Sequence, residues 1–493
     1  MPQIQFFGSQ VGGGTVINYS YTDMPWKLVF WDFWNFLKYA RSLIWVVMPL
    51  WPCYGGSFDE LSLTFQHVWC LSVHTVLIIL QVIFLLGLLP LLFILPGWLF
   101  VSGLVTFFAV NALICRTLNG STIQYTSDPK YSPHWERFEH EQWIFLNGVS
   151  IGESWLKDNL NRLALTFGRP VLGIHNRTSG IIFDLIECII QRSFGYATTD
   201  VRLVYKILKD KLYNPQYTTV VFIIHSQGGI EGGLVIDWLL QEVPQDLLAK
   251  LEVYTFGNAA NHFNNPHRHQ SSQEAQVKHP HILNDMFQRF PHFTGDIEKT
   301  GIKTGFENPL SHPALSNDQG SSELESHGAA LDRAIGHIEH YAHTGDFVAL
   351  WGVLHFITNT RASAEIPRFV GRLFAHHATG HLLSQHYLND MFPLAKNAFG
   401  EFTGCAESNE FMDSIISLPG QGEGDNIIQA IREGLGHSFA ALDHIALPKS
   451  DVSVQGRLIE REISILNGPV RVRDLSRLWQ YRNGQTPRII RKV

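Results

Sequence analysis

Residues 220–240 have the sequence VVFIIHSQGGIEGGLVIDWLL, which carries the clearest indication of the fold class. Its first part, VVFIIH, is a continuous apolar run, which is typical of a strand buried on both faces of a parallel sheet. Its last part has the apolar spacing of an amphipathic helix. Ser226 stands at the turn between the two parts, followed by Gln227 and two glycines. A buried strand, a sharp turn and a helix are the building blocks of an α/β sheet.

The chain around this stretch repeats the same rhythm. Short runs of β type alternate with helix-length amphipathic segments, which predicts an α/β fold with a mostly parallel sheet and helices on both faces. The six expected strands are residues 142–149, 169–176, 218–225, 251–258, 337–346 and 369–377.

The turn at Ser226 resembles the nucleophile elbow of the α/β-hydrolase superfamily, in particular lipase- and esterase-like members with His-Ser-x-Gly-Gly at this place. The resemblance implies an α/β-hydrolase fold in which Ser226 is a nucleophile raised above the sheet edge. His225, Gly228 and Gly229 complete the elbow. The chain departs from the G-x-S-x-G pattern at Ile224, where the pattern has glycine. We expect this bulky side chain to strain the turn.

The same resemblance implies an oxyanion hole beside the nucleophile. One donor is expected to be the backbone N–H of Gln227, because free N–H groups at a helix start favour developing negative charge. The other is expected from FLNGVSIGESW (145–155), the loop after the first expected strand. Val149 is the expected second donor, with Gly148 beside it.

An acid and a base are expected downstream, because the superfamily has its triad in the chain order Ser, acid, His. HIEHYAHTGDFVAL (337–350) ends an expected strand in a turn similar to the one that carries the carboxylate in many relatives, so Asp346 is the expected acid. Gly380-His381 follows the last expected strand and opens a helical segment, as the catalytic histidine does in relatives. His381 is therefore the expected base. The weaker candidates for these two positions are Asp332, Glu339, His376, His377 and His386.

Residues Leu61–Cys115 contain no Asp, Glu, Lys or Arg, a run longer than a core helix of a soluble protein requires. A bilayer core takes about 20 apolar residues per helical crossing. Residues 66–115 therefore predict two transmembrane helices or one deep hairpin, with Pro90 and Pro96-Gly97 near the middle as natural separation points. Residues 25–50 are rich in Trp and Phe with interspersed Lys and Arg, which predicts a helix at the bilayer surface, with a further membrane crossing as the alternative.

Basic residues flank the apolar segment and predict that both of its ends face the cytosol. They are Lys27, Lys38 and Arg41 before it and Arg116 after it. We expect a location at the endoplasmic reticulum or the lipid-droplet surface, with the catalytic domain facing the cytosol. Five widely spaced cysteines indicate no disulfide framework, which favours the same side. Glycosylation would indicate a lumenal side instead, and the sequons are at Asn18, Asn119 and Asn176.

These patterns divide the chain into three regions. We expect a membrane-associated segment at 1–120, a catalytic domain at 121–400 and a helical, basic tail at 401–493. A polar, His-rich insertion at about 259–335 is expected to form a cap or lid over the site. A zinc site around His267 and His269 in this insertion is the weaker interpretation, because no Cys or carboxylate stands at ligand spacing.

The predicted activity is hydrolysis of an ester or thioester of a hydrophobic, lipid-like substrate through the triad of Ser226, His381 and Asp346. The expected partners are the lipid bilayer and the acyl substrate, and no cofactor or metal is expected. The formal net charge of −7 over 493 residues gives no general attraction to nucleic acid. Two other functions stay open: an acyltransferase that uses the same triad, and a catalytically inactive membrane scaffold with a hydrolase-like fold.

Overall fold

The structure, a computed structural model, describes residues 4–7, 24–268, 333–358, 369–417 and 471–487. Within these ranges one sheet has the strand order β11-β1-β8-β7-β6-β5-β3-β4-β2. Its strands are β1 (Ile4–Phe7), β2 (Gln124–Thr126), β3 (Glu141–Leu146), β4 (Val171–Ile174), β5 (Thr219–His225), β6 (Leu251–Phe256), β7 (His337–His343), β8 (Arg372–His376) and β11 (Ile416–Ser417). A separate ribbon pairs β9 (Leu394–Lys396) with β10 (Phe402–Cys405).

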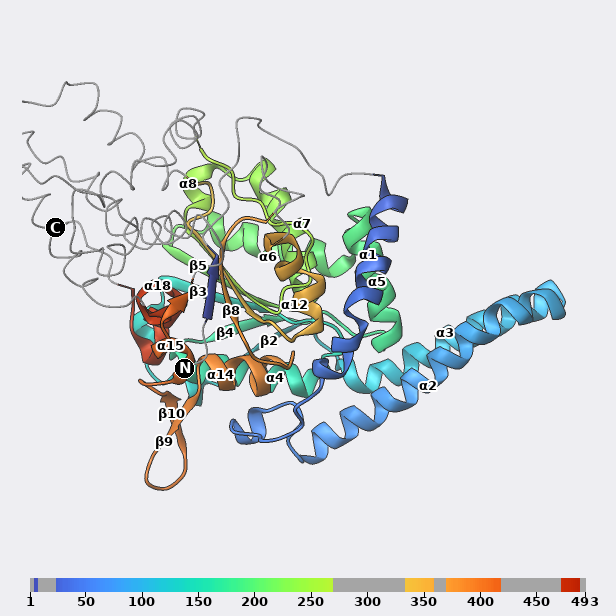
Figure 1. Cartoon of the computed structure of the whole chain (residues 1–493), viewed down its shortest axis with the longest axis horizontal. Helices are drawn as coiled ribbons and strands as arrows, with labels where there is room; N and C mark the ends of the chain where they lie inside the picture. Colours follow the sequence, from blue (N-terminus) through green and yellow to red (C-terminus); the bar gives the residue numbers. More distant parts are fainter. Residues whose placement is uncertain (1–3, 8–23, 269–332, 359–368, 418–470, 488–493) are drawn as a thin grey trace, which may run out of the picture.

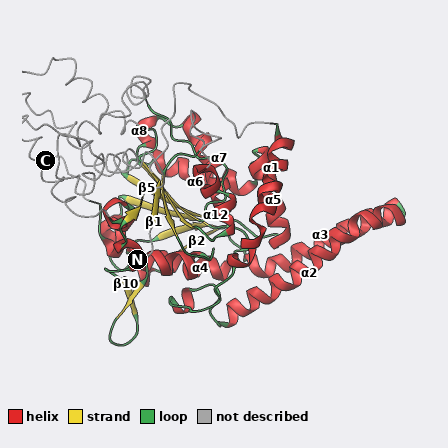
Figure 2. Ribbon diagram, in the orientation of Figure 1, coloured by secondary structure: helices red, strands yellow, loops and turns green. Residues whose placement is uncertain are grey.

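Helices surround the sheet, as Figure 2 shows. In the N-terminal part they are α1 (Pro25–Tyr39), the 3-10 helices η2 (Ala40–Val46) and η3 (Gly56–Phe58), α2 (Phe65–Ile94) and α3 (Gly97–Asn119). Around the sheet they are η4 (Pro129–Tyr131), η5 (Trp135–Phe138), α4 (Glu153–Phe167), α5 (Ile181–Phe194), α6 (Thr199–Tyr213), α7 (Gly228–Glu242), α8 (Gln245–Leu248), α12 (Phe347–Trp351), α13 (Val353–Thr358), the π-helical turn η9 (Leu383–Leu388), α14 (Asn389–Met391), α15 (Glu410–Asp413), α18 (Val472–Leu475) and η10 (Leu478–Gly484).

The six central strands, in the order β4-β3-β5-β6-β7-β8, are parallel to one another. The short strands β2 and β1 join their two edges in antiparallel orientation. The predicted α/β class with a mostly parallel sheet is therefore present. All six expected strands exist, each shorter than expected, because the chain leaves the hydrogen-bonded ladder in the turns at the strand ends.

Two apolar cores lie on opposite faces of the sheet. Side chains alternate along β3, so that Trp143 and Phe145 belong to one core and Ile144 and Leu146 to the other. Residues of α4 fill the first core, and residues of α6 and α7 fill the second. A sheet covered on both faces requires continuous apolar strands, which explains the unbroken VVFII run of β5.

The helices α2 and α3 run side by side and project from the body as a long hairpin (Figure 1). Both are long and apolar enough to cross a membrane, and only 11% of the most apolar window of each is buried, unlike the core helix of a soluble protein. The two helices of the hairpin are separated by Leu95 and Pro96, whereas Pro90 lies inside α2. The expected pair of hydrophobic helices is thus present, with its bend at the second of the two proposed positions.

A few polar side chains fasten the hairpin to the body near its base. Gln81 Nε2 donates to Asn111 Oδ1 at 2.9 Å and to the Ser179 carbonyl at 2.7 Å, and Gln81 Oε1 accepts from the N–H of Ile182 at 3.2 Å. Gln81 and Asn111 are buried at this junction with α5. The hairpin is therefore docked on the sheet domain by specific contacts and not joined to it by a loop alone.

Helix α1 corresponds to the aromatic helix expected from the sequence. One of its faces is exposed and the other packs against the body of the protein. Its exposed aromatic side chains are Trp26, Phe30, Trp31, Phe33 and Trp34. On its other side, Asp32 is buried and pairs with Arg192 of α5 at 2.9 Å. The indole N–H of Trp351 donates to the Asp32 carbonyl at 3.1 Å. The ion pair therefore fixes which aromatic face points away from the body.

The expected region boundaries differ from the structure at both ends. Residues 4–7 form β1 inside the main sheet, where Ile4 and Phe6 are fully buried, although 1–120 were expected to be a membrane segment. The tail expected at 401–493 also joins the body, since Trp479 and Tyr481 lie in the core and Arg477 pairs with Glu252 at 2.6 Å. A four-residue strand and isolated aromatic residues leave too weak a period to be recognised in a sequence.

Other expectations meet the structure only in part. Of the lid expected at 259–335, residues 269–332 lie outside the described ranges, as do Asn18 and most of the tail. Asn176 is buried, and the Asn119 amide is hydrogen bonded to the backbone of Thr178 through both of its polar atoms, so neither amide is free to carry a glycan. All five cysteines have free thiols.

Candidate active site

Ser226 lies where the order in which strands are added to the sheet reverses, from one side of β3 to the other. From β3 the chain goes outward to β4 and then returns to the other side of β3 as β5, so the topology switches direction between the carboxyl ends of β3 and β5. Ser226 directly follows β5, and the loop after β3 lies against it. This is the place where open α/β sheets bind their ligands.

The turn at Ser226 is sharp and strained. Ser226 has φ of 59°, a left-handed conformation that costs a residue with a side chain on the order of 1–3 kcal/mol. Its N–H donates to the Phe256 carbonyl at 3.1 Å, and its carbonyl accepts from Gly229 at 2.9 Å and from Ala259 at 3.2 Å. These bonds to β6 and α7 hold the strained residue in place.

Ile224, the departure from the elbow pattern, is accommodated by glycines in the helix that follows. Ile224 is fully buried, and a Cβ atom at Gly232 would lie 2.6 Å from its Cδ1 atom. A Cβ at Gly228 would lie 3.2 Å from Ile224 Cγ2 and 2.9 Å from the Asn147 carbonyl. The close approach of strand and helix therefore occurs with the bulky residue on the strand and the small residues on the helix.

Ser226, His381 and Asp346 lie within hydrogen-bonding distance in the order of a catalytic triad. His381 Nε2 is 2.8 Å from Ser226 Oγ, and His381 Nδ1 is 2.8 Å from Asp346 Oδ2. The three side chains come from the loops after β5, β8 and β7, which all end at the same edge of the sheet. The three residues expected from the sequence are thus brought together by the parallel strands.

Asp346 is held as a carboxylate by several donors. Burial by itself raises the pKa of Asp346, but the charge and hydrogen bond of His381, together with the hydrogen bonds of Tyr387 and Val348, outweigh burial, so the pKa of Asp346 is lowered. The hydroxyl of Tyr387 donates to Oδ2 at 2.7 Å, and the N–H of Val348 donates to Oδ1 at 2.8 Å. The carboxylate therefore caps α12 and orients the imidazole at the same time.

His225 supports His381 from the elbow side. The two rings stack with centroids 4.7 Å apart, and His225 Nε2 donates to the His381 carbonyl at 2.7 Å. Burial, followed by the neighbouring His381, lowers the pKa of His225 to about 3, so this imidazole is neutral. Its hydrogen bond fixes the backbone that carries His381.

Two backbone N–H groups at the expected oxyanion positions have no acceptor among the described residues. They belong to Gln227 and Val149. Gly148 lets the Val149 loop pack closely against Ser226, since a Cβ atom at position 148 would lie 2.4 Å from Ser226 Cβ. Gly229 allows a different close approach, that of the Asn258 side chain, because a Cβ atom at position 229 would lie 2.0 Å from Asn258 Oδ1.

A network of amides fixes the two loops that carry these donors. Asn147 Nδ2 donates to the Asn176 carbonyl at 2.9 Å, and Asn147 Oδ1 accepts from the Asn176 N–H at 2.9 Å. Asn176 Nδ2 then donates to Gln227 Oε1 at 2.9 Å, and Gln227 Nε2 donates to Gln191 at 3.1 Å. The two loops that carry the expected oxyanion donors are therefore held in place by side chains outside them.

The other candidates lie elsewhere. Glu339 is in the core and accepts from the Arg477 N–H at 2.7 Å, and Asp332 lies outside the described ranges. His386 Nε2 donates to the Pro49 carbonyl at 3.0 Å, and His377 is hydrogen bonded to Thr344. His376 contacts Asp390. Of the zinc site considered in the insertion, His269 lies outside the described ranges.

The segment between α1 and α2 contacts the loop that carries His381. This contact was not predicted from the sequence. Glu60 is buried, and its two oxygens accept from the N–H groups of Ser384 and Gln385, both at 2.9 Å. Gln385 Nε2 donates in turn to the Leu50 carbonyl at 3.0 Å. Glu60 stands just before the apolar helix α2, so a contact at the start of the apolar hairpin orients the loop that carries His381.

A small apolar cluster lies next to the triad and includes residues of α1 and η2. Its buried members are Cys188, Ile230, Ala259, Phe347 and Trp351, with Phe36, Tyr39, Val46, Val149, Ile189 and Val348 packed against them. Phe347 directly follows Asp346, and its ring meets that of Phe36 edge to face at 5.1 Å. The aromatic helix therefore contributes apolar side chains beside the reactive groups.

Comparison with known proteins adds no relative, since neither a protein-family model nor a curated protein matches this chain. Residues that sequence reasoning missed, Tyr387 and Glu60 among them, carry no motif that would have found them.

Proposed function

We propose that this protein is a serine hydrolase of the α/β-hydrolase superfamily that cleaves esters or thioesters of hydrophobic, lipid-like substrates. One observation carries the proposal: His381 bridges Ser226 Oγ and Asp346 Oδ2 with two contacts of 2.8 Å. An incidental serine at a strand–helix turn needs neither the left-handed φ nor an imidazole backed by a buried carboxylate. The chain order Ser, Asp, His and the turn after a parallel strand support the superfamily.

The chemistry follows from the roles of these atoms. His381 Nε2 takes the proton of Ser226 as Oγ attacks the acyl carbonyl, and Asp346 stabilises the imidazolium that forms. The oxygen that becomes negative accepts hydrogen bonds from the N–H groups of Gln227 and Val149. Collapse of this intermediate expels the alcohol or thiol, which receives the proton from His381. Water then attacks the acyl-enzyme, gives a proton to His381 and releases the acid with Ser226 restored.

The apolar surroundings support a hydrophobic acyl group. Phe36, Val46 and Phe347 belong to the cluster beside the triad, and α1 carries exposed tryptophans on its other side. Tryptophans of this kind favour the boundary between headgroups and acyl chains. We infer that α1 lies at the membrane surface with α2 and α3 inserted, so the reactive serine is next to the layer that holds its substrate. We place the catalytic domain on the cytosolic side of the endoplasmic reticulum or lipid droplet, which fits five free thiols.

A fluorophosphonate probe tests the proposal directly, because it reacts with an activated serine and not with an ordinary one. We expect the full-length protein in detergent to be labelled, and Ser226→Ala to lose the label completely. Ser121→Ala removes an exposed serine at the end of the hairpin and serves as the matched control with unchanged labelling. A folded protein that is not labelled would contradict the hydrolase and favour the scaffold. Products formed from an ester in water with and without an added alcohol separate hydrolysis from acyl transfer.

A further inference from the structure

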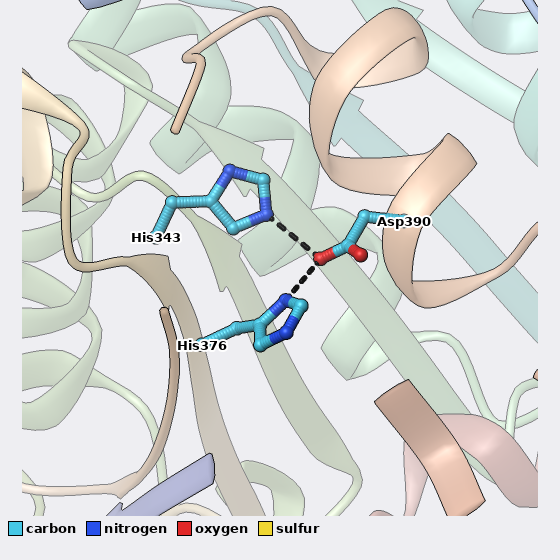
Figure 3. Close-up of side chains that lie close together, drawn as sticks. All are labelled: His343, His376 and Asp390. Atoms are coloured by element: carbon cyan, nitrogen blue, oxygen red, sulfur yellow. Dashed lines mark hydrogen bonds and ion pairs between the residues drawn. The ribbon is translucent and has the colours of Figure 1, made fainter. Parts of the chain in front are cut away.

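Two histidines and one aspartate converge on one point near the ends of β7 and β8. His343 closes β7, His376 closes β8, and Asp390 lies in α14 (Figure 3). His343 Nε2 is 3.1 Å from Asp390 Oδ2, and His376 Nδ1 is 2.5 Å from the same oxygen. One nitrogen from each ring and one carboxylate oxygen lie within 4.8 Å of one another. None of the three side chains belongs to the proposed triad.

The hydrogen-bond geometry of His343 indicates a cation between its Nε2 atom and Asp390. Its Nδ1 faces the Gly380 carbonyl at 3.0 Å, and a carbonyl can only accept, so Nδ1 carries the hydrogen. In the neutral ring, Nε2 then carries no hydrogen and can only accept. It nevertheless faces a carboxylate oxygen of Asp390, which is also an acceptor. Two acceptors facing each other repel unless a positive ion lies between them. A histidine that donates one N–H to a backbone carbonyl and offers the other nitrogen is also the usual arrangement of a metal ligand.

We propose that His343, His376 and Asp390 bind one divalent transition-metal ion of the zinc class. Two imidazoles and one carboxylate are a ligand set that zinc accepts, with water in the remaining position. The side chains of His343 and His376 are 1% and 9% exposed and that of Asp390 is 28% exposed, so the cluster is enclosed except at the carboxylate, where an ion and its water can enter. The sequence could not indicate this site, because its ligands do not lie at the short spacings of known zinc motifs.

The two contacts with Asp390 require a small adjustment on binding, and the two ring nitrogens, which lie within 4.8 Å of each other, must also come to the spacing of a tetrahedral site. Bonds of about 2.0–2.1 Å in a tetrahedron separate neighbouring ligand atoms by about 3.3 Å. The His343 contact of 3.1 Å already has this length, and the His376 contact of 2.5 Å must widen by less than about 1 Å, which a rotation of the Asp390 carboxylate supplies.

The ion would have a structural effect on the neighbouring loop. His343 holds the Gly380 carbonyl, and Gly380 directly precedes His381. The His343 ring also stacks on Tyr387 with centroids 4.2 Å apart, and Tyr387 donates to Asp346. A metal that locks His343 therefore stiffens the segment from residue 380 to residue 390 without contacting the reactive groups.

Metal analysis of the full-length protein in detergent tests the site without relying on activity. The protein is stripped with a chelator, equilibrated with Zn²⁺, freed of excess ion by gel filtration and assayed by mass spectrometry of the metal. We expect one zinc per chain in the wild type, and an affinity at least about 100-fold weaker in Asp390→Asn. His377→Asn, which removes the neighbouring histidine outside the cluster, is the matched control and should bind like the wild type.

A second measurement keeps the result independent of folding defects. Zn²⁺ should raise the thermal unfolding midpoint of the wild type and of His377→Asn, and leave that of Asp390→Asn and His376→Gln unchanged. Absence of retained zinc in the wild type would overturn the proposal. Equal zinc retention by the wild type and Asp390→Asn would also overturn it, since the ion would be held elsewhere.

Discussion

The substitution Gly232→Ala tests how this elbow tolerates an isoleucine where the pattern has glycine. In the wild type, a methyl group at position 232 would lie 2.6 Å from Ile224 Cδ1, closer than carbon atoms approach in proteins. The next neighbours are Phe222 Cε1 at 3.5 Å and Ile224 Cγ1 at 3.7 Å, which are ordinary contacts. One atom, Ile224 Cδ1, therefore accounts for the whole clash.

The size of the effect follows from two opposing terms. Overpacking in a buried site costs about 1–3 kcal/mol, and alanine in place of glycine in a helix returns up to about 1 kcal/mol. The net expectation is that Gly232→Ala destabilises the wild type by about 0–3 kcal/mol. In the Ile224→Val background, which lacks Cδ1, the same change should be neutral or stabilising by up to about 1 kcal/mol. Ile224→Val alone costs about 0.5–1.5 kcal/mol through the lost methyl group.

Urea unfolding of the four proteins of this cycle in detergent measures the coupling between the two positions. We expect a coupling energy of about 1–3 kcal/mol, with fluorophosphonate labelling restored in the double variant if Gly232→Ala reduces it. Additive effects within about 0.5 kcal/mol would refute the reasoning, because residues 224 and 232 would then not share this contact.

Three further predictions concern the charges around the site. Burial raises the pKa of Glu60 from 4.5 to about 7. Its contribution to the free energy of unfolding is therefore full below pH 4.5 and is lost as the pH rises through about 7. Urea unfolding across this range should show a flatter dependence of the free energy of unfolding on pH for Glu60→Gln than for the wild type, and an unchanged slope would contradict this. Asp32→Asn should cost about 3 kcal/mol in the same assay by leaving the buried Arg192 without its counter-charge, whereas Asp128→Asn at an exposed pair should change nothing measurable. Asp346→Asn should lower kcat on a soluble ester about 10⁴-fold with little change in unfolding; a loss below about tenfold would remove Asp346 from the triad.

Local sequence was sufficient for the six central parallel strands and for the strand–turn–helix at Ser226. A strand buried on both faces needs an apolar run, and such a run with a turn after it is visible in β5 without any knowledge of the rest of the chain. The hairpin was equally visible, because a bilayer demands a length and a composition that a soluble core does not. Short elements such as β1 escaped, since four residues do not establish a period.

The choice of partners was decided by the tertiary structure. Four histidines between residues 376 and 386 have similar local surroundings in the sequence, and only the register of β7 and β8 and the path of the following loop bring His381 to Ser226. The contact of Glu60 with Ser384 joins residues 324 positions apart, and no local preference encodes such a pair. The sequence by itself determined which segments form strands, the elbow and the apolar hairpin, because backbone conformation and burial follow from neighbouring residues. Which side chains meet at the sheet edge depends on how parallel strands align in space, and only the folded chain decides that.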